Sequence, residues 1–199
     1  MKLNYDVLTK FEKVISDYTG APFVVLTDSC THAIEICLRH TTEFILYYIP
    51  KRTYLSVPML FSKLNLELSF VDENWEHEYN IRPTNIWDSA RLLAPGMYQT
   101  GQLQCLSFGH TKPLEIGHGG AILLDDYEKY KTLKMMAYDG RDLDIVPWEK
   151  QKEFKVGYHY NMRLEDAVKG IEMMSNKEVK SLESQKVIYP DCSKLTIFS

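Results

Sequence analysis

The sequence predicts an α/β domain with a mainly parallel sheet flanked by helices. Short apolar runs typical of strands alternate along the chain with segments in which apolar residues recur every three or four positions, as in an amphipathic helix. The chain has 199 residues, of which 45% are hydrophobic, and this is enough to build one hydrophobic core. The sequence contains no internal repeats and no low-complexity tracts.

The expected elements follow from these local patterns. We predict helices at 7–18, 31–40, 54–64, 127–138 and 164–174, and strands at 23–26, 44–49, 66–71, 85–87, 103–108 and 121–124. Gly20 is placed to end the first helix. The polar stretch 72–84 is expected to be a loop. Residues 1–174 form the expected domain, and 175–199 form a short tail of weak periodicity.

Composition argues against several classes of function. The net charge is −4 without a basic run, so no nucleic-acid partner is expected. The longest apolar run, 44–50, is too short to span a membrane. The four cysteines form no C-x-x-C pair and the histidines show no metal-binding spacing, so neither a metal site nor a disulfide framework is expected. The first residues lack the apolar segment of a signal peptide, and a reduced, cytoplasmic setting is expected.

One lysine lies in a context suited to nucleophilic chemistry. Lys112 follows an apolar strand that ends near Ser107, and glycines keep its turn open at Gly109, Gly119 and Gly120. A lysine placed in this way can be desolvated enough to act as a nucleophilic amine. The alternative is a solvated turn lysine, which is the commonest fate of this residue type.

A second segment is suited to binding a phosphate. Residues 27–31, Thr-Asp-Ser-Cys-Thr, lead from a strand into a helix through small hydroxyl side chains. The free N–H groups at the start of a helix and the helix dipole both favour a phosphate there. The alternative is that Asp28 or Ser29 is a plain N-cap.

An aspartate follows the short strand at 85–87. At the carboxyl end of a parallel strand, Asp88 would face a ligand crevice. A buried carboxylate needs a cationic partner, and a protonated pyridine nitrogen would satisfy it. The alternative is a surface turn in which Asp88 pairs with Arg91.

Each signal is weak alone, but their order along the chain resembles a known family. The resemblance is carried by Ser29-Cys30-Thr31, Tyr54, the segments 88–91, 107–112 and 119–123, and the segment 157–162. These residues are similar to those of the DegT/DnrJ/EryC1/StrS family of nucleotide-sugar aminotransferases, which depend on pyridoxal 5'-phosphate (PLP). The resemblance covers most of 5–174 and implies the large domain of a fold-type I PLP-dependent transferase.

The resemblance also implies a role for each matching residue. Lys112 would hold PLP covalently and shuttle protons, and Asp88 would pair with the pyridinium nitrogen. Tyr54 would stack on the cofactor ring. Arg91 stands where the family has Gln or His near the phenolic oxygen of the cofactor.

The phosphate of the cofactor would be held by residues of two chains. The residues that would hold it within one chain are Ser29, Cys30, Thr31 and Ser107. His159 or Asn161 would reach the phosphate bound by a neighbouring subunit. The resemblance therefore implies a homodimer with shared active sites.

The chain departs from the family pattern at four places. Cys30 replaces the glycine of a Ser-Gly-Thr motif, and Arg91 adds a positive charge beside the cofactor. A strand and a helix that the family has between 79–81 and Asp88 are missing. The small carboxyl-terminal domain of the family is expected to be largely missing after residue 174.

The resemblance predicts an aminotransferase that moves an amino group from an amino acid, with glutamate as the expected donor, to a nucleotide-linked keto sugar. A sugar dehydratase of the same family would carry His in place of the lysine, so Lys112 argues against it. The lost segments keep open a catalytically impaired PLP-binding remnant that acts as a binding or partner subunit. An α/β binding module without a cofactor is a further alternative, because fold alone does not fix function.

Overall fold

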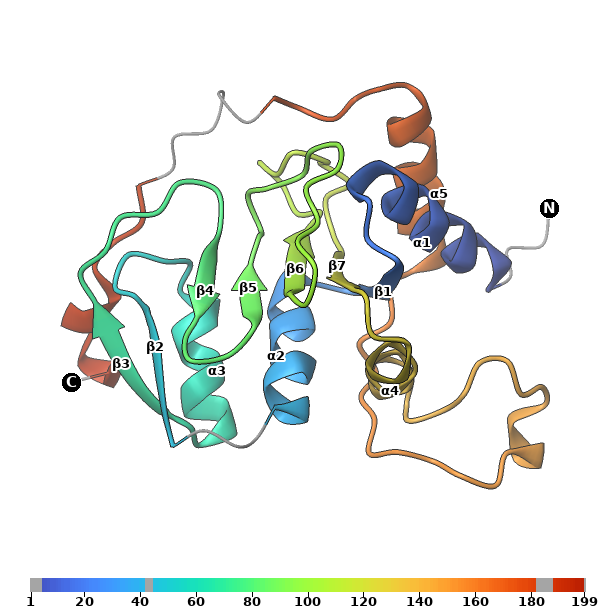
Figure 1. Cartoon of the computed structure of the whole chain (residues 1–199), viewed down its shortest axis with the longest axis horizontal. Coiled ribbons are helices and arrows are strands. Elements are labelled where there is room, and N and C mark those ends of the chain that lie inside the picture. The colour runs from blue at the N-terminus through green and yellow to red at the C-terminus, as the bar shows by residue number, and fades with distance from the viewer. Residues whose placement is uncertain (1–4, 42–44, 182–187, 199) are drawn as a thin grey trace.

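A computed structural model describes residues 5–41, 45–181 and 188–198 (Figure 1). The helices are α1 (Asp6–Thr19), α2 (Cys30–His40), α3 (Ser56–Leu64), α4 (Tyr127–Ala137) and α5 (Leu164–Ser175). The strands are β1 (Phe23–Thr27), β2 (Leu46–Pro50), β3 (Glu67–Val71), β4 (Tyr79–Ile81), β5 (Ile86–Asp88), β6 (Leu103–Ser107) and β7 (Gly120–Leu124). Short 3-10 helices follow at η1 (Trp148–Lys150), η3 (Cys192–Lys194) and η4 (Thr196–Phe198).

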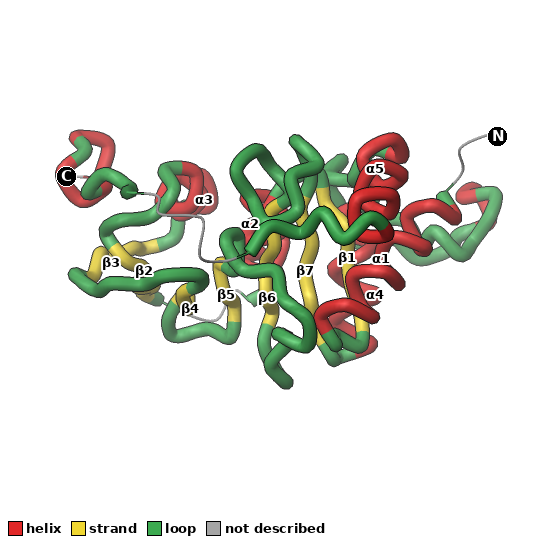
Figure 2. The backbone as a smooth tube through the Cα atoms, turned by 90° about the horizontal axis from the view of Figure 1, so that it is seen from above, coloured by secondary structure: helices red, strands yellow, loops and turns green. Residues whose placement is uncertain are grey.

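The strands form a five-stranded sheet and a two-stranded sheet, which one backbone bridge joins. The strands β1, β7, β6, β5 and β4 are hydrogen-bonded neighbours in that order, and β2 pairs with β3. The β2–β3 pair continues the sheet at β4, because the backbones of Tyr48 and Arg82 exchange hydrogen bonds of 2.8 and 3.1 Å. Figure 2 shows the resulting order across the molecule, from β3 and β2 through β4, β5, β6 and β7 to β1.

Most strands in the described part of the chain run in one direction. β2 is parallel to β3, and β5 is parallel to β6. β7 is antiparallel to both of its neighbours, β6 and β1. β4 is antiparallel to β5 and, through the Tyr48–Arg82 bridge, to β2. The predicted common direction therefore holds for all strands except β4 and β7, and these two reversed strands make most neighbouring pairs antiparallel.

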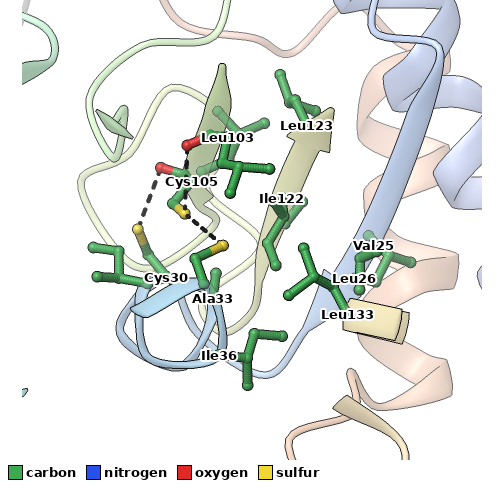
Figure 3. Packing of buried hydrophobic residues seen from close by; sticks show 14 of the residues in the cluster. Val25, Leu26, Cys30, Ala33, Ile36, Leu103, Cys105, Ile122, Leu123 and Leu133 are labelled. Carbon is green, nitrogen blue, oxygen red and sulfur yellow. Dashed lines mark hydrogen bonds between the residues drawn. The ribbon is translucent and has the colours of Figure 1, made fainter. Parts of the chain in front are cut away.

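The core lies between the sheet and the helices that cover it. α2 packs on β5, β6 and β7, α4 packs on β1 and α2, and α1 packs on β1 and α5. Figure 3 shows Cys30, Ala33 and Ile36 of α2 facing Cys105 of β6 and Ile122 of β7. Burial of this apolar face holds α2 in place, and its amino-terminal end is thereby fixed beside the ends of β5 and β6.

The structure corrects some of the predicted elements. The stretch 72–84 is not only a loop, because it contains β4. Its three residues gain their order by pairing with β5, an interaction that a local sequence pattern does not show. Tyr54 precedes α3 instead of lying inside it. Phe44, expected to begin a strand, lies outside the described residues.

The described part of the tail packs back on the domain. The backbone N–H of Cys192 donates to the carbonyl of Lys51 at 2.8 Å, and the Cys192 thiol lies 3.5 Å from the carbonyl oxygen of Thr53. Cys192 is fully buried. Figure 1 shows this end of the chain beside β3. The tail residues before η3 are thereby brought to the same end of the sheet as Asp88.

Candidate active site

A cavity of about 450 Å³ lies where β5 and β6 end and α2 begins. Because β5 and β6 are parallel, their carboxyl ends meet at the same edge, and this edge is where α/β sheets place ligands. The turn after β1, the ends of β5 and β6, and the lysine turn supply many of the lining residues, among them Asp28, Ser29, Cys30, Thr31, Asp88, Ala90, Arg91, Ser107, Gly109 and Lys112. Tyr54, Trp75 and Tyr189 line it from other parts of the chain.

Asp88 is buried at the end of β5 and held by two hydrogen bonds. Its Oδ2 accepts from the hydroxyl of Tyr79 at 2.9 Å, and its Oδ1 accepts from the N–H of Ala90 at 3.0 Å. No Lys, Arg or His nitrogen of the described residues lies within ion-pair distance of this carboxylate. Burial raises the pKa of Asp88, and the two hydrogen bonds and Lys112 oppose that rise. The alternative, a surface turn in which Asp88 pairs with Arg91, is therefore not found.

The start of α2 is fixed by Ser29, whose hydroxyl accepts from the N–H of His32 at 3.2 Å. Ser29 is thus an N-cap as well as a residue of the cavity wall. Asp28 Oδ1 lies 2.6 Å from His32 Nδ1, and His32 stacks on the ring of Tyr160 with centroids 3.6 Å apart. The N–H of Asp28 donates to the carbonyl of Tyr160 at 2.7 Å. The segment around residue 160 therefore supports the α2 start from outside the cavity.

Glycines allow β7 to approach this helix start closely. A Cβ added at Gly120 would lie 2.5 Å from the backbone nitrogen of Cys30 and 2.5 Å from the carbonyl carbon of Ser29. Gly119 has a φ of +114°, in the region that favours glycine, and its Cβ would lie 2.5 Å from Met162 Cε. The two glycines therefore keep the wall between the lysine turn and α2 free of side chains.

Lys112 lies on a turn in which its N–H donates to the carbonyl of Gly109 at 3.4 Å. The residue before it, Thr111, has a φ of +68°, which is unusual for a β-branched residue and marks local strain. Burial lowers the pKa of Lys112, and the positive charge of Arg91 lowers it further, while the carboxylate of Asp88 acts in the opposite direction. A lysine with a lowered pKa is more often neutral, and a neutral amine is the nucleophilic form.

Cys30 lies between these groups at the first turn of α2. Its thiol is 3.3 Å from the carbonyl oxygen of Cys105 and 4.0 Å from Asp88 Oδ1 (Figure 3 shows the Cys105 contact). Burial and the carboxylate of Asp88 raise the pKa of Cys30 well above that of a free thiol, so it remains protonated. Cys30 therefore serves here as a small buried residue that packs against the end of β5.

An aromatic wall closes one side of the cavity. Trp75 and Tyr189 stack with ring centroids 5.7 Å apart, and Tyr189 meets Tyr54 edge to face at 6.4 Å. The indole N–H of Trp75 donates to the carbonyl of Arg52 at 2.7 Å. Sequence reasoning missed Trp75, Tyr79 and Tyr189, because they lie in segments without periodicity.

Eight of the predicted site residues line this cavity, and two do not. Those brought together are Ser29, Cys30, Thr31, Tyr54, Asp88, Arg91, Ser107 and Lys112. His159 is exposed and its Nδ1 lies 3.0 Å from Asp139 Oδ1, and Asn161 is also absent from the cavity wall. The described residues contain no cluster of side chains suited to a metal ion and no helix long and apolar enough to cross a membrane.

Solved structures share this fold at low sequence identity. AtS13 from Actinomadura melliaura superposes with a TM-score of 0.71 and 17% identity, over 87% of this chain and 61% of that chain. PseC from Helicobacter pylori, an aminotransferase involved in the biosynthesis of pseudoaminic acid, gives 0.69 and 15%, over 86% and 58%. The PMP form of Spr1654 from Streptococcus pneumoniae, described as a sugar aminotransferase, gives 0.68 and 18%, over 85% and 58%. The fold is that of the large domain of fold-type I PLP-dependent transferases, and the chain spans about three fifths of the length of these structures.

The sequence itself also matches a family. No curated protein sequence matches the chain. The sequence model of the DegT/DnrJ/EryC1/StrS aminotransferase family matches residues 2–89 and 97–186. The matched segments contain Ser29, Asp88 and Lys112, whereas Arg91 lies in the gap between them. The chain therefore belongs to the DegT/DnrJ/EryC1/StrS aminotransferase family.

Proposed function

We propose that the chain is a PLP-dependent aminotransferase that moves an amino group from an amino acid to a nucleotide-linked keto sugar. Glutamate is the amino acid that we propose as the donor. The observation that carries this proposal is the meeting of Lys112, Asp88 and the start of α2 in one cavity. These three features come from parts of the chain about 25 to 80 residues apart. Membership of an aminotransferase family supports the same reaction class.

The residues of the cavity fit PLP. The volume of about 450 Å³ lies within the usual range for small-molecule sites. Asp88 is a buried carboxylate with hydrogen-bond donors but no cationic partner among the described residues, as a site for a pyridinium nitrogen requires. When bound, PLP would supply an aldehyde that condenses with amines and a ring that withdraws electrons.

The chain's own residues would hold and orient this cofactor. The first N–H groups of α2, with Ser29, Cys30 and Thr31, would bind the phosphate, and Ser107 would reach it from the end of β6. Asp88 would keep a proton on the ring nitrogen, because a buried carboxylate strongly favours a cation beside it.

The lysine and the aromatic wall would have separate tasks. Lys112 would provide the amine that anchors the cofactor and, once released, would accept and return a proton at its Nζ. Tyr54 would pack against the ring. Trp75 and Tyr189 would exclude water from that side of the cavity.

We also propose a homodimer with shared active sites. His159 and Asn161 do not line the cavity of their own chain, so a role at a phosphate requires a second copy. Mixing Lys112→Ala with His159→Ala chains tests this. Shared sites predict that the mixture recovers part of the activity that neither variant has alone, and no recovery would contradict them. The four buried free cysteines support a reducing, cytoplasmic setting, which cell fractionation would test.

The proposed reaction is tested by its first half-reaction, the transfer of the amino group from glutamate to the cofactor. The protein is loaded with PLP, freed of excess cofactor and mixed with glutamate, and 2-oxoglutarate is measured. We expect close to one equivalent per bound PLP, and none from Lys112→Ala. Bound PLP without 2-oxoglutarate would contradict the transfer of an amino group from glutamate. Failure to bind PLP would contradict the proposal as a whole.

A further inference from the structure

Arg91 is a buried cation without a partner. It is 8% exposed, and among the described residues it makes no hydrogen bond and no ion pair. Its Nε is completely shielded from solvent. The other five arginines each pair with a carboxylate: Arg39 with Glu35, Arg52 with Asp72, Arg82 with Glu73, Arg141 with Asp139, and Arg163 with Asp166.

A largely buried guanidinium without a partner is costly, because burial removes much of its hydration and, at Nε, no hydrogen bond replaces the lost water. Such a group is compensated when a ligand brings a negative charge. Arg91 lines the same cavity as Lys112 and Asp88, and it lies close enough to Lys112 to act on its charge. Asp88 cannot serve as its partner, because Tyr79 and Ala90 already orient that carboxylate and no ion pair forms. The cavity therefore contains a preformed receptor for an anion.

The chemistry of the proposed reaction indicates which anion. The planar guanidinium binds a carboxylate through two parallel hydrogen bonds. An α-amino acid carries its carboxylate one carbon away from the amino nitrogen. That nitrogen must reach the position otherwise used by Lys112 Nζ, so the carboxylate arrives beside Lys112 as well. The phosphate of the cofactor already has a receptor at the start of α2.

We propose that Arg91 binds the carboxylate of the amino-group donor, in place of the contact with the phenolic oxygen of the cofactor that the resemblance implied. This assignment rests on the proposed aminotransferase function. The match to the family leaves out residues 90–96, so this receptor is a feature of this chain and not one carried over from the matched segments. Arg91 would select amino acids over neutral amines as donors.

The test measures binding of glutarate, which has the carbon skeleton of glutamate without its amino group. Calorimetry on the PLP-loaded protein is expected to show glutarate binding that weakens at least about tenfold in Arg91→Gln, the loss of a charge-assisted hydrogen-bond pair. Arg91→Lys should bind glutarate with intermediate affinity, because lysine keeps the positive charge but cannot form the two parallel hydrogen bonds of a guanidinium. Arg141→Gln is the matched control. Arg141 also has a buried Nε without a partner, but it pairs with Asp139 and lies outside the cavity.

Three results would overturn the assignment. The first is that glutarate does not bind the wild-type protein. The second is that glutarate binds Arg91→Gln as tightly as it binds wild type. In the third, Arg91→Gln loses its visible PLP absorbance, which would place the arginine on the cofactor and not on the donor. If the wild-type protein takes up no PLP, the proposed function fails by itself. The same variants are then compared for glutarate binding without cofactor, and an unchanged affinity in Arg91→Gln would overturn the assignment separately.

Discussion

The hydroxyl of Tyr79 donates a hydrogen bond to Asp88 Oδ2 at 2.9 Å, across the antiparallel pair formed by β4 and β5. The two residues are directly opposite in the register of that pair. The same hydroxyl lies 2.6 Å from Thr53 Oγ1. The side chains of Tyr79 and Thr53 are both buried. The short β4–β5 hairpin thus supplies the group that orients the carboxylate at the end of β5.

Replacing this tyrosine should change the acidity of Asp88. The Tyr79 hydroxyl stabilises the charged carboxylate, so Tyr79→Phe should raise the pKa of Asp88 further. Carboxyl NMR titration of the cofactor-free protein measures this directly. Tyr98→Phe is the control, because its hydroxyl donates to the carbonyl of Gln102 at 3.1 Å outside the cavity. An unchanged Asp88 pKa in Tyr79→Phe would contradict the assigned role of the hydrogen bond.

The buried charge of Asp88 should also make stability depend on pH. Burial raises the pKa of Asp88 in the folded protein above its value in the unfolded chain. Between these two pKa values the folded state binds more protons, so the free energy of unfolding falls as pH rises through that window. Asp88→Asn removes this penalty. Relative to wild type, the cofactor-free variant should therefore gain stability as pH rises through the window and keep the gain at neutral pH.

Urea unfolding at a series of pH values checks this, with Asp126→Asn as the control of opposite sign. Asp126 caps α4 and accepts from the N–H of Lys129, which lowers its pKa. The Asp126 carboxylate therefore adds to the free energy of unfolding of wild type at pH values above its unfolded pKa, and this contribution is lost as pH falls. Asp126→Asn lacks the contribution, so its stability relative to wild type should fall as pH rises. The same pH trend in both variants would contradict the opposite environments assigned to the two aspartates.

The close approach of β7 to α2 should make Gly120 sensitive to substitution. In Gly120→Ala the new methyl group would meet backbone atoms of Cys30 and Ser29 at 2.5 Å, and backbone cannot move aside as a flexible side chain can. We expect a loss of roughly 1–3 kcal/mol in the free energy of unfolding and weaker PLP binding. Gly109→Ala is the control, because its methyl would meet only Ser107 Oγ at 3.5 Å. Equal stability of the two variants in urea unfolding would refute the packing argument.

The tail residue Tyr189 should shield Trp75. Tyr189→Ala removes the ring stacked on the indole, so acrylamide should quench tryptophan fluorescence more strongly. The increase should vanish in a Trp75→Phe background, which excludes the other two tryptophans. Phe198→Ala serves as control, because Phe198 packs on Phe70, with ring centroids 5.6 Å apart, and not on the cavity. Unchanged quenching in Tyr189→Ala would show that the tail does not cover the site.

Local signals account for what the sequence predicted well. Residues 7–18 lie within α1, and Gly20 ends that helix with a left-handed φ of 80°, as its position indicated. The strands that carry Asp88 and Ser107 end within one residue of the predicted positions. Apolar runs and helix-ending glycines act over a few residues, so they can be read from the sequence without knowledge of the fold.

The features that could not be predicted from the sequence depend on interactions between residues far apart in the chain. β4 has three residues, too few for an alternation to be recognised, and its order comes from pairing with β5. Tyr189 reaches the cavity because Cys192 docks on Lys51 and Thr53, which lie about 140 residues earlier in the chain. The lack of an Asp88–Arg91 pair was likewise not predictable, since it depends on Tyr79 and Ala90 both holding the carboxylate.

The central claim is that the amine of Lys112 is the one that reacts with PLP. The protein is loaded with PLP, reduced with borohydride, which fixes the cofactor on the amine it has joined, and digested for mass spectrometry. Because burial and Arg91 lower the pKa of Lys112, the account predicts that the modification lies on Lys112 at about one per chain. Modification of a different lysine, or of none, would contradict it.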